Sequence, residues 1–255
     1  FEAIYPDWLD IVTRAEQADA NEGDPGPAWS IDLKGRLGPL SRAKRLARRA
    51  VCRSRLHGIG TGMNSYAAAN RGFVIPCRYR SVQLCLNYKV GSSGDDAIDW
   101  VAAAAAYNMK GDIWECPDRP GAYTDNDIYY QMLLGYQYFG GIRTWTNPWG
   151  KFPSRSPDQL GVSGSGWVLA ADCTMKIDSV WGGGRPSAYA NMPQHRADDP
   201  WPEGGNHVYA DGSAGWVEFQ KMIYIHSWGG WARIAYWYQR DLGEFVPPEA
   251  AMAKP

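Results

Sequence analysis

The stretch GPLSRAKRLARRAVCRSRLHGIGTGMNSYAAA, residues 38–69, decides the fold that the sequence predicts. Gly38-Pro39 places a proline in a first helical turn, where its missing N–H costs little. Apolar residues then recur at helical spacing from Leu40 to Ala67, with lysine and arginine between them. We therefore expect a long helix over about residues 39–69, with an apolar stripe on one side and basic side chains on the other.

Three glycines, Gly58, Gly60 and Gly62, lie within this expected helix. Each glycine costs about 1 kcal/mol in an exposed helix interior. We therefore expect another element of the fold to pack closely against the helix at these three positions.

The rest of the chain predicts a short second helix and then a β-rich part. The second helix is expected over about residues 95–109, with Ser92 or Ser93 as its N-cap. From 111 to 240, short apolar runs alternate with turn residues, which is typical of antiparallel strands joined by loops. The fold class is therefore α+β, with an N-terminal helix packed on a loop-rich antiparallel β part. Residues 1–37 are expected to form an irregular extension, and 38–255 a single domain.

Composition excludes several classes of protein. The chain has 255 residues, a net charge of −1, and 13 Trp and 15 Tyr, so it is long enough and apolar enough to fold. It contains no run of about 18 apolar residues, so we expect no transmembrane segment. Its first residues include acids and a proline, unlike a signal peptide. The sequence lacks GxSxG, Walker, HExxH and strand-linked GxGxxG patterns, so we expect no enzyme and no required cofactor.

Charge is unevenly distributed along the chain. Between Leu33 and Gly94 there are 13 Lys or Arg and no acidic residue, which leaves 13 basic and 27 acidic residues elsewhere. Seven of these basic residues form a candidate interface: Arg42, Lys44, Arg45, Arg48, Arg49, Arg53 and Arg55. Such a run can bind nucleic acid or a membrane surface. We favour a helix face matched to acidic groups on the same or a neighbouring subunit.

Four groups of motifs follow one another along the chain. ARRAVCRSRLHGIG (47–60) is followed by MNSYAAANRGFVIP (63–76), then by CPDR (116–119) and LGYQYF (134–139). WVLAAD (167–172) comes next, and His195-Arg precedes GGNHVYADGSAGWV (204–217). In this order they resemble the pilin-like, type II secretion pseudopilin-like proteins of Planctomycetes and Verrucomicrobia, over about residues 38–239. The chain departs from that family in having Tyr5 where members carry glutamate, followed by polar residues instead of an apolar segment.

The resemblance implies a pilin-like fold and a non-enzymatic role. A protein of this kind would be exported to the cell surface, the extracellular space or the periplasm. It would self-assemble, or join other components of a filament, a secretion apparatus or a surface complex. Nucleic acid is not an expected partner.

The pair Asp211-Gly212 lies between two strand-like runs. A tight turn with glycine at positive φ accounts for it without chemistry. Asp172 also ends an apolar run, so the two carboxylates could instead meet and bind calcium, or act as a general acid and base. We favour the structural turn, with a calcium site as the next alternative.

The remaining metal-ligating side chains are scattered. His195 and His207, with Asp198 and Asp199 nearby, could form a metal site, although hydrogen-bonded structural histidines are the favoured interpretation. The five cysteines are odd in number and include no CxxC pair, so the common zinc and thioredoxin spacings are absent. Cys77 and Cys85 flank a strand-like segment and could form a disulfide if it bends back.

Tryptophan is frequent in the β-rich part, and this frequency indicates an alternative function. Exposed flat rings can stack on sugars, so a surface carbohydrate-binding module is the alternative to assembly. Five tryptophans in segments rich in glycine and proline are the candidates for exposed glycan or subunit contacts: Trp145, Trp149, Trp181, Trp201 and Trp228.

Overall fold

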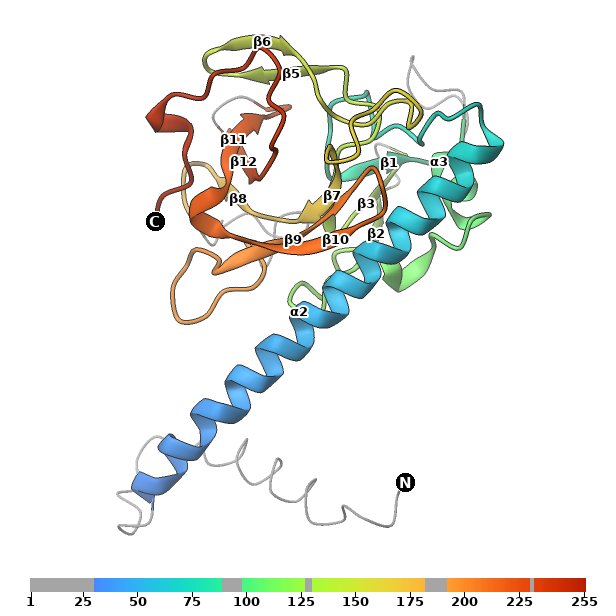
Figure 1. Cartoon of the computed structure of the whole chain (residues 1–255). Coiled ribbons are helices and arrows are strands. Elements are labelled where there is room, and N and C mark those ends of the chain that lie inside the picture. The colour runs from blue at the N-terminus through green and yellow to red at the C-terminus, as the bar shows by residue number, and fades with distance from the viewer. Residues whose placement is uncertain (1–29, 89–97, 127–129, 182–191, 230–231) are drawn as a thin grey trace, which may run out of the picture. The chain divides into compact units, whose positions relative to one another are not determined.

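The computed structural model describes residues 30–88, 98–126, 130–181, 192–229 and 232–255 (Figure 1). The chain divides into two compact units, 1–44 and 45–255, and the boundary falls within helix α2 (Ser30–Ala69). Every strand of the described residues belongs to the second unit. The core and the candidate site therefore lie in that unit.

The described elements are one long helix, short helices and short strands. After α2 they are β1 (Cys85–Asn87), α3 (Trp100–Ala105), η1 (Gly111–Trp114), β2 (Thr124–Asn126), β3 (Gln131–Leu133), β4 (Tyr136–Tyr138), β5 (Thr144–Asn147), β6 (Gly150–Pro153), β7 (Val168–Asp172), β8 (Met175–Ile177), β9 (Gly204–Tyr209), β10 (Ala214–Glu218), η2 (Phe219–Lys221), β11 (Ile223–His226), β12 (Arg233–Trp237) and η4 (Glu249–Ala251). The strands pair antiparallel in the orders β10-β9-β7-β4, β11-β12-β8, β1-β3-β2 and β5-β6. The fold is therefore mixed α+β and mostly β, as predicted.

One face of α2 enters the hydrophobic core. Cys52, Leu56, Ile59 and Met63 recur at helical spacing, and all four are fully buried. A Cβ on Gly60 would lie 2.7 Å from Cγ2 of Val208, a residue of β9. Gly58 and Gly62 are crowded in the same way by Ile113 and Met109, respectively. The predicted close approach at the three glycines is therefore confirmed.

The predicted stripe was wrong over residues 46–51 of this helix. Leu46, Ala47, Ala50 and Val51 are exposed, whereas the nearby arginines Arg45, Arg48 and Arg49 are half-buried. Acidic side chains of the β-rich part account for this, because they pair with those arginines and draw them to the packed side. The polar face of α2 thus faces the protein over this stretch.

Both predicted helix boundaries also need correction. Helix α2 begins at Ser30 and not at about residue 39, so Pro39 lies inside it. A proline in a helix interior lacks the N–H of one backbone hydrogen bond. Helix α3 covers only Trp100–Ala105 of the predicted 95–109, because Asp99 caps its first turn and Asn108 adopts a positive φ of 63° beyond its end. Ser92 and Ser93 lie outside the described residues.

The hairpin β9–β10 lies against α2. Its turn contains Gly212 at φ 83°, and Asp211 Oδ1 accepts hydrogen bonds from the backbone N and the hydroxyl of Ser213 at 2.8 and 2.6 Å. His57 Nδ1 donates to the Gly212 carbonyl at 2.9 Å, which ties the turn to the helix. The structural interpretation of Asp211-Gly212 is confirmed.

Among the described residues, helix α2 is too polar to span a lipid bilayer, and the other helices are too short. This agrees with the absence of a long apolar run from the sequence.

Candidate functional site

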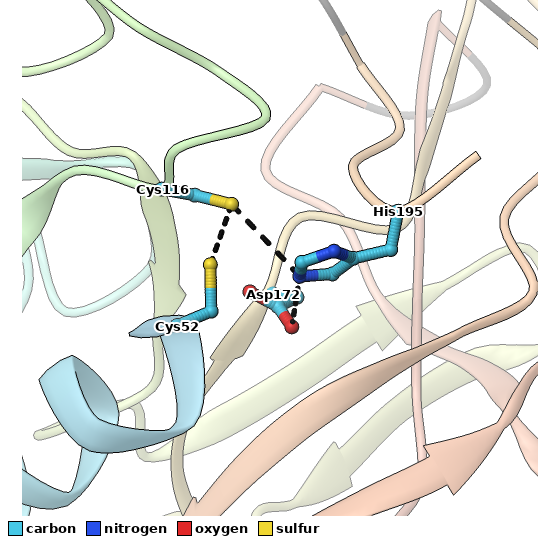
Figure 2. Close-up of side chains that lie close together, drawn as sticks. All are labelled: Cys52, Cys116, Asp172 and His195. Carbon is cyan, nitrogen blue, oxygen red and sulfur yellow. Dashed lines mark hydrogen bonds and ion pairs between the residues drawn. The ribbon is translucent and has the colours of Figure 1, made fainter. Parts of the chain in front are cut away.

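Four side chains from distant parts of the chain meet in the core (Figure 2). Cys52 comes from α2, Cys116 from the segment after η1, Asp172 from the end of β7, and His195 from the segment before β9. Their sulfur, nitrogen and oxygen atoms all lie within 4.8 Å of one another. None of the four residues is more than 3% exposed. We call this group the buried cluster.

The strand pair β7–β9 fixes the carboxylate of the buried cluster. Ala171 is paired with His207, so Asp172 lies beside Asn206 on the neighbouring strand. The backbone N and the side-chain Nδ2 of Asn206 both donate to Asp172 Oδ2, at 2.6 and 2.9 Å. The other oxygen, Oδ1, is buried and has no hydrogen-bond partner among the described residues. One oxygen of Asp172 is thus anchored and the other is left for a different contact.

His195 lies between two carboxylates. Its Nδ1 is 2.7 Å from Asp118 Oδ2, and its Nε2 is 3.0 Å from Asp172 Oδ2. Burial alone would lower the pKa of His195, but Asp172 and Asp118 outweigh burial and raise that pKa to about 12. Arg48 pairs with the same Asp118 at 2.8 Å, and together with His195 it lowers the pKa of that carboxyl in spite of burial. The ring is therefore held in one orientation by charged partners.

The two thiols of the cluster are adjacent. Their Sγ atoms are 2.7 Å apart, and Cys116 Sγ is 3.9 Å from Nε2 of His195. The hydrogen bond from Cys116 lowers the pKa of Cys52 in spite of burial, whereas burial raises the pKa of Cys116.

These residues suit ligand binding better than nucleophilic catalysis. Cys116, His195 and Asp118 are the residue types of a thiol–imidazole–carboxylate triad. Cys116 is fully buried, however, and Nε2 of His195 is closer to Asp172 than to the sulfur. A substrate could not reach this sulfur without local opening. Two thiols, an imidazole and a carboxylate are instead a donor set for a borderline metal ion.

An open pocket of about 510 Å³ lies next to the cluster. Its wall includes Arg48, Asp118 and His195, together with the loop residues Asp198 and Asp199. Asp198 and Asp199 are exposed and do not join the buried cluster. Solvent in the pocket therefore reaches Asp118, whose side chain is 16% exposed, whereas the side chain of His195 is only 1% exposed.

Asp172 and Asp211, the candidate calcium ligands, do not lie close together in the structure. Asp172 ends β7 beside Asn206, whereas Asp211 follows Tyr209, which pairs with Val168 at the other end of the same strands. The length of β9 separates the two carboxylates, and Asp211 is occupied by the turn. His207 is not a member of the buried cluster, and its ring nitrogens have backbone partners: the Gly205 carbonyl at 3.1 Å and the Tyr238 amide at 3.0 Å.

The basic residues have acidic partners in the same chain. Arg48 pairs with Asp118, Arg55 with Asp112 at 2.9 Å, and both Arg45 and Arg49 with Glu203. Arg49 also lies over the ring of Trp216, 4.1 Å from its centroid. Three members of the predicted interface are exposed: Arg42, Lys44 and Arg53. The alternative of a helix face matched to acids of the same subunit therefore accounts for four of the seven.

Most of the predicted aromatic contacts are not exposed. Trp145 is fully buried within β5, and Trp181 is 9% exposed, so the prediction was wrong for both. Trp201 and Trp228 are half-buried, and Trp149 alone of the five is exposed, at 36%. The reason is packing: Trp145 contacts Trp237, and Trp181 contacts Phe219 and Tyr236. An exposed row of rings for sugar stacking is not formed by these residues.

Sequence reasoning missed Cys52, Cys116 and Asp118 as site residues. The two cysteines are 64 residues apart, so no short metal-binding spacing marks them. The available signal was their place within two of the quoted motifs, ARRAVC and CPD. No cysteine of the described residues, which include all five, forms a disulfide. The suggested Cys77–Cys85 bond is therefore absent.

Comparisons with known proteins do not assign a family. No protein-family model matches the chain, and no curated protein or solved structure is significantly similar to it. Function is therefore inferred from residues and geometry.

Proposed function

We propose that the chain is a non-enzymatic, pilin-like structural subunit that assembles with copies of itself at the cell surface or outside the cell. Other components of a filament, secretion apparatus or surface complex would be its further partners. The observation that carries this proposal is an exposed apolar face on α2, formed by Leu46, Ala47, Ala50 and Val51. We call these four residues the apolar helix face.

The apolar helix face is distinct from the face that enters the core. At 100° per residue, its centre lies roughly opposite the side that carries Cys52 and Leu56. Leu46 is 50% exposed and Val51 is 42% exposed, while the alanines between them let a second helix approach closely. Arg45, Arg48 and Arg49 turn toward their acidic partners and away from this face, whereas the exposed Arg53 lines a pocket with Leu46 and Ala50 at its edge. The apolar helix face fits an apolar helix of another subunit.

The buried cluster supports the non-enzymatic part of the proposal. Its four residues are at most 3% exposed, and both cysteines are fully buried. A catalytic group must lie within hydrogen-bond reach of its substrate. Groups enclosed to this degree are better suited to maintaining the fold than to turnover.

Self-association tests the proposal directly. We expect the wild-type chain to form oligomers in sedimentation equilibrium, and a double variant Leu46→Asp/Val51→Asp to weaken them tenfold or more. A charge buried in an apolar contact costs more than the roughly 1.4 kcal/mol to which that factor corresponds. The matched control is Val162→Asp/Val246→Asp, which alters valines that are 78% and 84% exposed elsewhere.

Two outcomes would contradict this function. The first is a wild-type chain that stays monomeric at the highest concentration reached. The second is an equal loss of association in both double variants, which would show that added charge, and not the apolar helix face, controls assembly.

A further inference from the structure

The buried cluster contains donor atoms that converge from four chain segments. The closest approaches are 2.7 Å between the sulfurs of Cys52 and Cys116, and 3.0 Å between His195 Nε2 and Asp172 Oδ2. Sulfur and nitrogen are 3.9 Å apart at Cys116 and His195. Zinc bonds of about 2.3 Å to sulfur and about 2.0–2.1 Å to nitrogen or oxygen place tetrahedral donors about 3.3–3.8 Å apart. The sulfur and nitrogen donors therefore match such a site after shifts of about 1 Å, and the ligand atoms of all four residues lie within 4.8 Å of one another.

The unpartnered oxygen of Asp172 is the second observation that points to a ligand. Oδ2 accepts two hydrogen bonds from Asn206, but Oδ1 is buried without a partner among the described residues. A buried polar atom without a partner costs about 1–3 kcal/mol, and more when it carries charge. A cation between Oδ1, the two sulfurs and the imidazole would remove that cost. A disulfide between the two cysteines would not remove that cost, because a disulfide has neither a charge nor a hydrogen-bond donor for Oδ1 of Asp172.

We propose that Cys52, Cys116, Asp172 and His195 bind one zinc ion in a closed, four-coordinate structural site. Zinc fits better than calcium, because two of the four donors are thiols and calcium prefers six to eight oxygens. On binding, the two thiols release their protons and bind as thiolates. His195 releases its proton from Nε2, binds through that nitrogen and keeps its proton on Nδ1.

Outer contacts of the cluster already have the form expected around a metal. Asp118 lies 2.7 Å from Nδ1 of His195, which is the carboxylate–histidine arrangement that orients metal-bound imidazoles. Arg48 in turn holds Asp118 at 2.8 Å. Asn206 fixes the carboxylate of Asp172 through its two donors. Asp118 and Asn206 are therefore positioning residues for the site.

The proposed zinc would link the long helix to the β-rich part. Cys52 belongs to α2, Asp172 to β7, and the other two ligands to segments between elements. Binding of an ion to the native state stabilises it by mass action, and structural zinc sites contribute folding free energy outright. This inference does not rest on assembly, since a monomer would need the same link.

Metal content and cobalt substitution test the site in the full chain. After purification without chelators and under reducing conditions, elemental analysis should find about one zinc per chain. Replacement of zinc by Co²⁺ should give the intense visible absorption of a tetrahedral cobalt–thiolate centre. Chelation should lower the melting temperature. These measurements use the wild-type chain, so they show whether zinc is bound even if a substitution prevents folding.

Variants identify the ligands. Cys116→Ala should lose the bound zinc and the cobalt–thiolate absorption, whereas Cys85→Ala, which removes another buried thiol, should keep both. Asp118→Asn should retain one site but weaken zinc binding by about 10–100-fold, as expected for a positioning residue.

Three results would overturn the proposal. One is a reduced wild-type chain that holds no zinc even after zinc is added. Another is a mass two units lower, with Cys52 and Cys116 joined in a disulfide, in protein that binds no metal. The third is a cobalt spectrum without thiolate character, or one that is unchanged in Cys116→Ala.

Discussion

His195 and His207 are both buried, yet the two regions around them differ in kind. His195 lies between the carboxylates of Asp118 and Asp172 and close to the two thiols. His207 sits on β9 beside Asn206, and its two nitrogens contact only the backbone of Gly205 and Tyr238. The sequence does not distinguish these two histidines, whereas the structure places one in a charged cluster and the other among backbone groups.

The contrast appears in their protonation. Burial lowers the pKa of both rings, and at His207 nothing outweighs it, so the pKa falls to about 4. At His195 the carboxylates outweigh burial and raise the pKa to about 12. The lesson is that burial alone does not identify a functional histidine. The partners do, since carboxylates and thiols place charge where a cation can be held.

Removal of Asp172 should give the largest effect and separate the two regions. Asp172→Ala leaves His195 and Asn206 without their shared acceptor in the core. Breaking a buried ion pair from one side costs about 3–5 kcal/mol. We expect urea unfolding in the presence of a chelator to show a loss of that size. Asp198→Ala, at an exposed carboxylate, should change stability by less than about 0.5 kcal/mol. Equal losses of unfolding free energy in Asp172→Ala and Asp198→Ala would show that the buried carboxylate contributes no more to stability than an exposed one.

Acid should destabilise the region of His207 next most strongly. The folded chain holds this ring neutral, because Nε2 accepts the Tyr238 amide and Nδ1 donates to the Gly205 carbonyl. Its folded pKa is about 4, and the unfolded value is about 6.5, so the unfolded chain binds the extra proton first as pH falls. The stability contributed by the depressed pKa is therefore present above about pH 6.5 and is lost toward pH 4.

The size of this effect is roughly 3 kcal/mol for the full pKa difference. Unfolding free energies from pH 6.5 to pH 4, measured with a chelator throughout, should show the decline, because above pH 6.5 the raised pKa of His195 gives the opposite slope. His207→Gln should be less stable at neutral pH but should have a shallower decline below pH 6.5. His226, whose burial also lowers its pKa, accounts for the part that remains. An unchanged slope in the variant would show that His207 does not carry the effect.

A change in the β9–β10 turn should have a smaller effect and should not discriminate between the regions. The hairpin carries both Asn206 and His207, and Gly212 turns it at φ 83°. Gly212→Val should cost about 1–3 kcal/mol through backbone strain, since an added Cβ would meet nothing closer than 3.7 Å. Asp211→Asn should cost less, because asparagine also accepts the Ser213 hydrogen bonds. A larger loss in melting temperature for Asn than for Val would contradict the turn interpretation.

Local patterns predicted the parts of the fold that depend on local physics. The helical period of Cys52 to Met63, the three glycines that contact neighbours and the turn at Gly212 follow from spacing and backbone preference. Spacing and backbone preference did not predict which side of α2 is exposed. Arg45 and Arg49 point toward Glu203, which lies more than 150 residues away, and no local rule places that acid beside the helix.

Only two of the four residues of the buried cluster could be predicted from the sequence, for the same reason. Asp172 and His195 were candidates from the sequence, but each was assigned the wrong partner, Asp211 and His207. The actual partners Cys52 and Cys116 are joined by tertiary packing across four segments. Pairing of β7 with β9 was needed to show that Asp172 and Asp211 lie at opposite ends of the strands.

X-ray absorption at the zinc edge tests the central claim most directly, namely that the region of His195 is a metal centre and that of His207 is not. We expect a coordination shell of two sulfurs at about 2.3 Å and two nitrogen or oxygen atoms at about 2.0–2.1 Å. Cys116→Ala should lose the sulfur shell, and His207→Gln should leave it unchanged. A shell of nitrogen and oxygen alone in the wild-type protein, or one altered by His207→Gln, would contradict the claim.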